Sequence, residues 1–180
     1  MRTIVIFTLF IVLGFLPVSA QEAGKLRAGV DVGCLHPHEG AFGFLKAIEL
    51  KYNLRNNMNF GIKVETTSFI KHKNYEAELL SFSITYDYYF PSTYRRSSPF
   101  IGVGLGYFLC KSYGGDDFIE LPWKFNNPAY FIRAGYEICK FRTFLTYNLI
   151  RKPSDKYRDN RNIDYISLSI GFYIGGGKWK

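Results

Sequence analysis

The chain has 180 residues, an aromatic content of 18%, a formal net charge of +8 and three cysteines. The length suits a single domain, and the positive charge favours acidic partners such as anionic lipid or nucleic acid. An odd number of cysteines without a CxxC pair gives no support for a disulfide framework or a zinc site. Beyond the first residues, no apolar run approaches the roughly 20 residues of a transmembrane helix, which excludes a helical membrane protein.

The first element in chain order is a targeting segment. Arg2 precedes an apolar run from Ile4 to Leu16, and small residues follow up to Ala20. A positive start, a short apolar stretch and a small-residue end are typical of a secretory signal peptide. We therefore predict cleavage of residues 1–20 and one mature domain over residues 21–180. Because an exported chain meets lipid first, we expect no nucleic-acid partner.

Eight segments with alternating apolar and polar residues follow the targeting segment. A sequence period of two over this length predicts β-strands. Ten residues tilted near 40° rise roughly 25 Å, which matches the apolar band of an outer-membrane barrel. The expected strands are 26–34, 44–53, 58–65, 80–88, 101–109, 130–138, 141–149 and 166–174.

The connections between these strands alternate in length. The long ones are 35–43, 68–76, 111–128 and 151–162, whereas 55–57 and 139–140 are tight and 91–98 is intermediate. Long loops on one side and short turns on the other are typical of outer-membrane barrels. We therefore predict an all-β fold, an eight-stranded antiparallel up-and-down transmembrane β-barrel with its long loops outside.

Five cations and five anions lie on the polar face of these strands. Equal numbers of both signs are what a closed interior requires, because a buried charge must be paired. The opposite face carries almost no charge, with Lys46 as the main exception, and has tyrosines at strand ends. The predicted lumen charge network consists of Arg27, Lys51, Lys63, Arg133, Arg142, Asp31, Glu49, Glu65, Asp87 and Glu137. A soluble barrel with an apolar cavity is the structural alternative.

The stretch Phe100–Cys110 places glycines at 102, 104 and 106. This spacing differs from the GxGxxG dinucleotide motif, and no helix pattern follows it. We instead predict that Gly102, Gly104 and Gly106 are small lumen residues, which let long charged side chains from facing strands cross the barrel.

The stretches PFIGVGLGYFL (99–109) and ISLSIGFYIGGGKWK (166–180) resemble strands of the small outer-membrane barrels of Gram-negative bacteria, the OmpA/OmpX-like class. The resemblance covers the whole mature chain. It implies a porin-like architecture without an open pore, a location in the bacterial outer membrane and recognition of the last strand by the barrel-assembly machinery. One departure is that a basic tail follows Phe172 and Tyr173, whereas many members end on an aromatic residue. Members include scaffolds, adhesins and lipid-modifying enzymes, so the resemblance implies no single activity.

The long loops carry basic residues that suit the phosphates of outer-membrane lipid. Arg and Lys donate charge-assisted hydrogen bonds to phosphate, so we expect contacts to lipopolysaccharide. The residues are Lys71, Lys73, Arg151, Lys152, Lys156, Arg158 and Arg161. Phe118, Trp123 and Phe125 in the third long loop suit an extracellular protein partner. Together these features predict a structural or recognition role.

No motif arranges a catalytic set. The three histidines, His36, His38 and His72, fall in long loops without an ordered serine or carboxylate beside them. His36, His38 and Glu39 are too few for a structural metal site, which normally takes four ligands. We assign no catalytic residue, metal or cofactor. A lipid A-modifying outer-membrane enzyme and a soluble lipocalin-like carrier remain alternatives.

Overall fold

The computed structural model describes residues 21–38, 42–72, 75–91, 97–113, 127–150 and 164–177. At residues 69–72, 75–77, 110–113 and 127 it describes the backbone alone. The predicted signal peptide lies outside these ranges. In the described part of the chain, no helix has the length and apolar character needed to cross a membrane.

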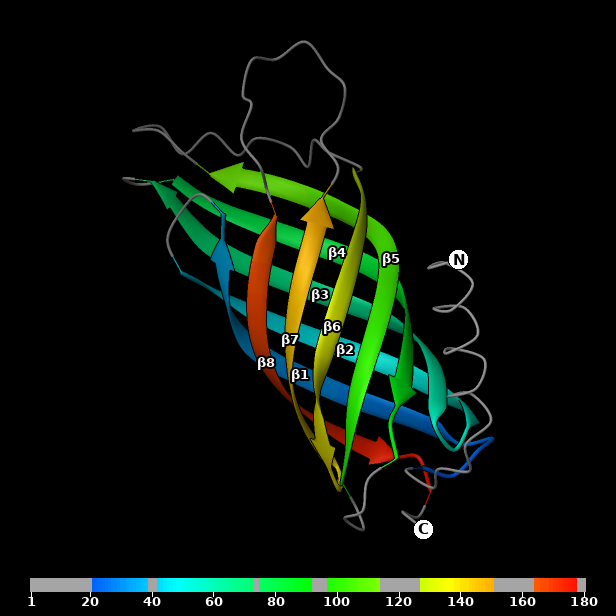
Figure 1. Ribbon diagram of the computed structural model, residues 1–180. Coiled ribbons are helices and arrows are strands. Elements are labelled where there is room, and N and C mark those ends of the chain that lie inside the picture. Colours follow the sequence, from blue (N-terminus) through cyan, green and yellow to red (C-terminus); the bar gives the residue numbers. More distant parts are fainter. Residues whose placement is uncertain are drawn as a thin grey trace, which may run out of the picture.

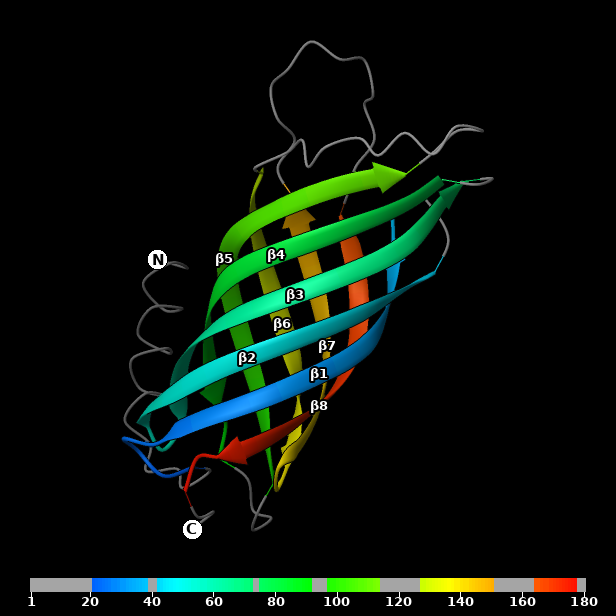
Figure 2. The same ribbon diagram turned by 180° about the vertical axis from the view of Figure 1, so that it is seen from behind.

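Eight antiparallel strands form one closed barrel (Figures 1 and 2). Each strand pairs with the next along the chain, and the last pairs with the first. This arrangement confirms the predicted fold class. The strands are β1 (Leu26–Pro37), β2 (Gly43–Arg55), β3 (Met58–His72), β4 (Tyr75–Tyr89), β5 (Ser97–Tyr113), β6 (Asn127–Ile138), β7 (Phe141–Ile150) and β8 (Tyr165–Gly175).

The strands are tilted because the barrel closes with a stagger. A path that starts at Leu26 and follows paired residues around the wall returns to β1 at His36, a stagger of 10 residues. Such a stagger requires strands inclined by about 35–45° to the barrel axis. Figure 1 shows the strands crossing the barrel wall obliquely. Tilted strands need more residues to cross a given thickness, which explains why all eight contain at least 10.

We call the end of the barrel where β1 continues to β2 the loop end and the opposite end the turn end. The turn-end connections 55–57 and 139–140 are as short as predicted. The predicted long loop 68–76 is wrong, because pairing between β3 and β4 continues from Ser68 opposite Glu78 to His72 opposite Tyr75. Backbone hydrogen bonds do not depend on hydropathy, so this hairpin extends beyond the region where apolar and polar residues alternate. Lys71 therefore belongs to a strand and not to a loop.

The outer face of the barrel is apolar and exposed, whereas the inner face is polar and buried. On β8, Ile170 is 60% exposed and the neighbouring Ser169 is 1% exposed. Tyrosines and phenylalanines of the outer face lie near both ends of the strands, in the manner of the aromatic girdles of outer-membrane barrels. The exception is Tyr88, predicted to face outward but only 7% exposed, which packs edge-to-face on Phe90 at the turn end. A soluble carrier needs the opposite arrangement, so these faces contradict that alternative.

Candidate functional site in the barrel lumen

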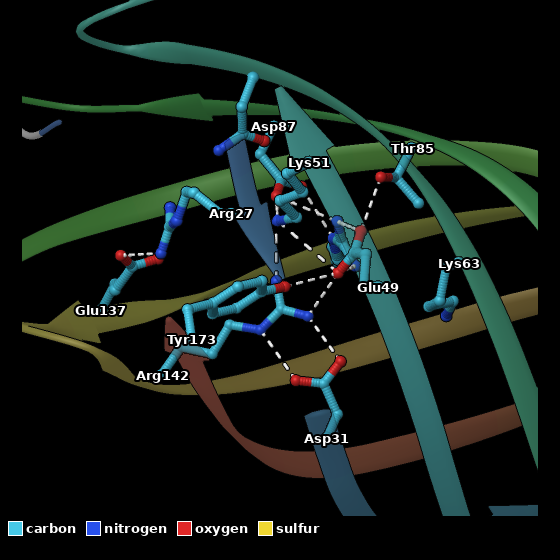
Figure 3. Close-up of polar contacts among 12 residues, drawn as sticks. Arg27, Asp31, Glu49, Lys51, Lys63, Thr85, Asp87, Glu137, Arg142 and Tyr173 are labelled. Carbon is cyan, nitrogen blue, oxygen red and sulfur yellow. Dashed lines mark hydrogen bonds and ion pairs between the residues drawn. The ribbon is translucent and has the colours of Figure 1, made fainter. Parts of the chain in front are cut away.

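Glu49 of β2 lies at the centre of the lumen and is fully buried (Figure 3). Its Oε1 accepts hydrogen bonds from Arg133 Nη2 at 2.8 Å and Thr85 Oγ1 at 2.6 Å. Its Oε2 accepts from Arg142 Nη2 and from Tyr173 Oη, both at 2.6 Å. The carboxylate is thus held by four strands besides its own, which fixes its position in the barrel.

Each arginine beside Glu49 also holds an aspartate through two hydrogen bonds. Arg133 Nε and Nη2 lie 2.7 and 3.0 Å from the two oxygens of Asp87. Arg142 Nε and Nη2 lie 3.1 and 2.6 Å from the two oxygens of Asp31. Two parallel hydrogen bonds between a guanidinium and a carboxylate are the strongest and most directional form of ion pair in proteins.

A glycine separates the two partners of each of these pairs. Gly102 of β5 is paired with Asp87 on β4 and Arg133 on β6. Gly171 of β8 is paired in the same way with Asp31 on β1 and Arg142 on β7. A Cβ atom at either glycine would meet the aspartate and arginine side chains. We call these two sets Asp–Gly–Arg triads, and each one joins three neighbouring strands.

Lys51 completes the central network. Its ammonium forms an ion pair with Asp87 and lies 3.7 Å from Glu49 Oε2. The centre therefore combines three cations with three anions, so it is neutral while every charged group in it is paired. The rings of Phe144 and Tyr173 lie 4.3 and 4.5 Å from the Arg142 guanidinium carbon, which adds cation–π contacts.

Two smaller ion pairs lie towards the ends of the lumen. At the turn end, Arg27 Nη2 is 2.5 Å from Glu137 Oε1, and Tyr89 Oη donates to Glu137 Oε2 at 2.8 Å. Towards the loop end, Lys63 Nζ is 2.6 Å from Glu65 Oε2. Tyr165 Oη donates to Glu65 Oε1, also at 2.6 Å.

Between the Glu65 ion pair and the loop end of the barrel, an apolar cluster fills the lumen. Its members are buried inward-facing residues near the loop ends of their strands. They are Leu35, Leu45, Ala47, Leu79, Phe108, Ala129, Ile150 and Tyr165. Ion pairs and packed side chains thus occupy the described lumen from one end to the other.

The three predicted lumen glycines are small for a reason different from the predicted one. The Phe131 ring of β6 lies over Gly104, and the backbone of β4 at Phe82 and Ser83 approaches Gly106. The groups that need the space come from adjacent strands, not from facing ones. A strong barrel curvature brings the inward side chains of adjacent strands together, so these neighbours need the space that the glycines leave.

All ten charged residues of the predicted network are buried and lie in ion pairs. Sequence reasoning missed their uncharged partners Thr85, Tyr89, Tyr165 and Tyr173. The alternation of the strands could have identified two of them, because Thr85 and Tyr89 are each two residues from Asp87 and therefore face the lumen with it. Tyrosines near strand ends suit an aromatic girdle, which conceals those that point inward, such as Tyr165 and Tyr173.

The other predicted positions lie mostly at the loop end. Lys73, Arg151, Lys152, Lys156, Arg158 and Arg161 fall outside the described residues, as do the aromatic residues of the third long loop. Among the described residues, no serine hydroxyl is hydrogen-bonded to a histidine, and no group of three metal-ligating side chains is suitably placed for a metal ion.

Three solved structures show what this chain is similar to. Neisserial surface protein A (NspA) matches with a TM-score of 0.64 at 17% identity, covering 83% of this chain and 95% of NspA. The outer membrane protein OprG from Pseudomonas aeruginosa matches with a TM-score of 0.57 at 10% identity, over 88% of this chain and 99% of OprG. The outer membrane enzyme PagL matches with a TM-score of 0.54 at 16% identity, covering 82% of this chain and 98% of PagL.

No family model and no curated protein matches the sequence. At the identities of the solved structures, the likeness concerns the fold. All three neighbours are bacterial surface or outer-membrane proteins, which supports the outer membrane as the location of this chain. With its lipid-facing outer wall and its ion-paired lumen, the chain has the fold of the small eight-stranded outer-membrane β-barrels, the OmpA/OmpX-like class.

Proposed function

We propose that this protein is a non-conducting outer-membrane barrel whose loop end recognises lipopolysaccharide. The observation that carries the proposal is the filled lumen. Arg133, Arg142 and Glu49 bridge the barrel at its centre, and the apolar cluster occupies its loop end. Eight-stranded barrels have an interior just wide enough for their own side chains. Function is therefore assigned to the outer surface and the connections, not to transport through the lumen.

Lipopolysaccharide is the proposed ligand because of the loop cations. The connection after β7 contains Arg151, Lys152, Lys156, Arg158 and Arg161, against Asp155, Asp159 and Asp164. An excess of guanidinium and ammonium groups beside the outer leaflet suits the phosphates there.

The experiment uses the mature barrel with all five of these cations changed to Gln. We expect weaker retention of lipopolysaccharide in micelles, measured by co-purification and titration, with an unchanged barrel band on unheated gels. Salt should weaken wild-type binding more than it weakens binding by the variant, because exposed charges are screened. A matched control changes the turn-end cations Lys25, Arg55 and Lys140 to Gln. Equal retention by wild type and loop variant would contradict the loop-end proposal.

Lipid A modification is a second candidate, favoured by the fold likeness to the outer membrane enzyme PagL. Mass spectrometry of lipid A from cells with and without the protein tests it. A change in the acyl profile would replace the binding proposal with an enzymatic one, whereas an unchanged profile would dispose of this candidate.

A further inference from the structure

Lys46 of β2 is a charged residue in an apolar stretch of the lipid-facing wall. Its side chain is exposed on the outer face, between Phe44 at 69% and Ile48 at 65% exposure. Among the outer-face residues that the structure describes, no other charged side chain lies between two apolar neighbours of its own strand. Within the residues that the structure describes, Lys46 takes part in no ion pair or hydrogen bond.

The residues beside Lys46 towards the loop end are also polar. Thr66 of β3 is paired with Lys46, and Ser68 is paired with Phe44, so both hydroxyls share the outer face with the ammonium. We call Lys46, Thr66 and Ser68 the wall patch. Glu78 of β4 is paired with Ser68, so its carboxylate lies beside the Ser68 end of the wall patch and has an interaction partner of its own. The wall patch itself is a set of three donors with one cation, Lys46.

The opposite wall is built differently near the loop end. There Tyr107, Tyr130 and Tyr147 lie on the outer faces of β5, β6 and β7 and are 60%, 53% and 39% exposed. Figure 2 shows β2 and β3 on the front wall, whereas β6 and β7 face the viewer in Figure 1. Tyrosines are the usual residues of an outer-membrane girdle. The wall of β2 and β3 instead carries an ammonium and two hydroxyls beside the exposed ring of Phe44.

The position of Lys46 suits a ligand at the level of the lipid headgroups. Lys46 is the next outward-facing residue after Phe44 along β2. Two residues of a tilted strand advance about 5 Å along the barrel axis, so Lys46 lies about 5 Å closer to the barrel midplane than Phe44. A lysine just inside the apolar region extends its stem towards the interface and places the ammonium among the headgroups. A cation at the midplane of such a barrel would cost about 2–4 kcal/mol, and the cost falls towards the interface.

We propose that the wall patch binds a phosphate group of lipid A, the lipid moiety of lipopolysaccharide, from the outer leaflet. This inference rests on the proposed function and adds a site on the wall of β2 and β3 to the contacts assigned to the loops. The Lys46 ammonium supplies the charge that pairs with the phosphate, and the Thr66 and Ser68 hydroxyls donate beside it. The acyl chains lie along Ile48, Val64 and Val32, which are exposed below the patch on β2, β3 and β1.

The test compares the mature barrel with the variant Lys46→Met, which keeps an unbranched apolar side chain facing lipid. Binding of lipid A with its phosphates and of dephosphorylated lipid A is measured by native mass spectrometry of detergent-solubilised protein. We expect Lys46→Met to bind phosphorylated lipid A about tenfold more weakly, the effect of losing one charge-assisted hydrogen bond. Binding of dephosphorylated lipid A should not change.

Three further variants act as controls. Lys46→Arg keeps the charge and should bind as wild type does. Thr66→Val removes a hydroxyl at constant shape and should give a smaller loss than Lys46→Met. Lys140→Met removes an exposed cation at the turn end and should have no effect. Mobility on unheated gels shows whether each variant is folded, and all three substituted residues are exposed on the wall or turn.

Several results would overturn the inference. The inference is wrong if Lys46→Met binds phosphorylated lipid A as tightly as wild type does. It is also wrong if the wild type binds phosphorylated and dephosphorylated lipid A equally. Equal competition by phosphatidylglycerol or by inorganic phosphate would remove lipid A as the occupant. If Lys46→Met bound lipid A more weakly but the loop variant kept its binding of lipopolysaccharide, the loop-end proposal would be wrong and the wall-patch proposal would stand. The reverse result would contradict the wall patch alone.

Discussion

Glu49 illustrates how single buried charges are tolerated in this barrel. Its two oxygens accept four hydrogen bonds of 2.6–2.8 Å from two arginines, a threonine and a tyrosine. A buried carboxylate is costly unless it is paired and hydrogen-bonded, and here both conditions are met. The same oxygens also relieve the charge repulsion between Arg133 and Arg142. One residue thereby determines whether three cations can lie together in the lumen.

We predict that Glu49→Gln will destabilise the barrel by about 3–5 kcal/mol, the usual cost of breaking a buried ion pair from one side. The amide keeps the shape but leaves Arg133, Arg142 and Lys51 with one carboxylate fewer. Urea titration of the refolded protein in micelles, followed by gel mobility, measures the change. Glu49→Lys should be more severe because it adds a fourth cation.

The matched control is Glu22→Gln at the turn end, where Glu22 lies 3.7 Å from Lys25 and both side chains are substantially exposed. Exposed pairs contribute about 1 kcal/mol or less, so this variant should unfold almost as wild type does. If both variants lost the same stability, the central role of Glu49 would be wrong.

At the scale of the strands, the two Asp–Gly–Arg triads connect elements that the backbone ladder already joins. Asp87 and Arg133 meet over β5, and Asp31 and Arg142 meet over β8. Since β8 closes the barrel against β1, the second triad bridges the closing seam. Side-chain pairs of this kind fix the register of neighbouring strands, because a slip of one residue would turn the charges outward.

We predict that Gly171→Ala will destabilise the barrel by about 1–3 kcal/mol, the usual range for overpacking. The added methyl group would meet Asp31 and Arg142 and displace one of them from the pair. Gly102→Ala should have a similar effect through Asp87 and Arg133. Urea titration and hydrogen exchange of the β1–β8 seam measure these changes.

Ser169→Ala is the control for Gly171→Ala, because Ser169 faces inward two residues earlier on the same strand. Its hydroxyl has no hydrogen-bond partner among the described residues. This variant should retain wild-type stability. A Gly171→Ala protein as stable as Ser169→Ala would show that the triad does not need the glycine.

At the scale of the whole molecule, the barrel has an apolar outside and an ion-paired inside, the reverse of a soluble protein. The turn end is further closed by residues 21 and 22, which precede β1. Gln21 Nε2 is 3.5 Å from Glu137 Oε1, and Asn53 Nδ2 donates to the Glu22 carbonyl oxygen at 3.0 Å. Gly176 donates its N–H to the Leu26 carbonyl oxygen at 2.8 Å, which ties the segment after β8 to β1. The described segments before β1 and after β8 thus both pack at the turn end.

We predict that the protein will show no stable conductance in planar lipid bilayers, because ion pairs and the loop-end apolar cluster occupy the lumen. Single-channel recording of protein purified from membranes measures this. A large-diameter porin at the same protein-to-lipid ratio serves as the positive control. Reproducible stepwise ion currents from the wild type would contradict the closed lumen.

Much of this protein could be predicted from the sequence because alternation is a local property. The number of strands, the inward parity of the ten charges and the tight turns at 55–57 and 139–140 follow from residues close together in the chain. The extended hairpin of β3 and β4 could not be predicted in this way, since backbone pairing continues where the alternation ends. Tyr88 shares the outer face with its partner Ile101 as predicted, but its low exposure could not be predicted because it packs against the Phe90 ring.

Only the tertiary structure decided which charges pair with one another. Arg142 and Asp31 are 111 positions apart and meet because β8 lies between β7 and β1 in the closed wall. The purpose of the glycines was equally hidden, since Gly104 faces a phenylalanine from the next strand. By itself the sequence determined which residues of each strand share a face, because that is a matter of period. The closed barrel then showed that the apolar face is the outer one. The stagger of 10 residues with which the barrel closes decided the partners, because it depends on the pairing of β1 with β8, which lie far apart in the sequence.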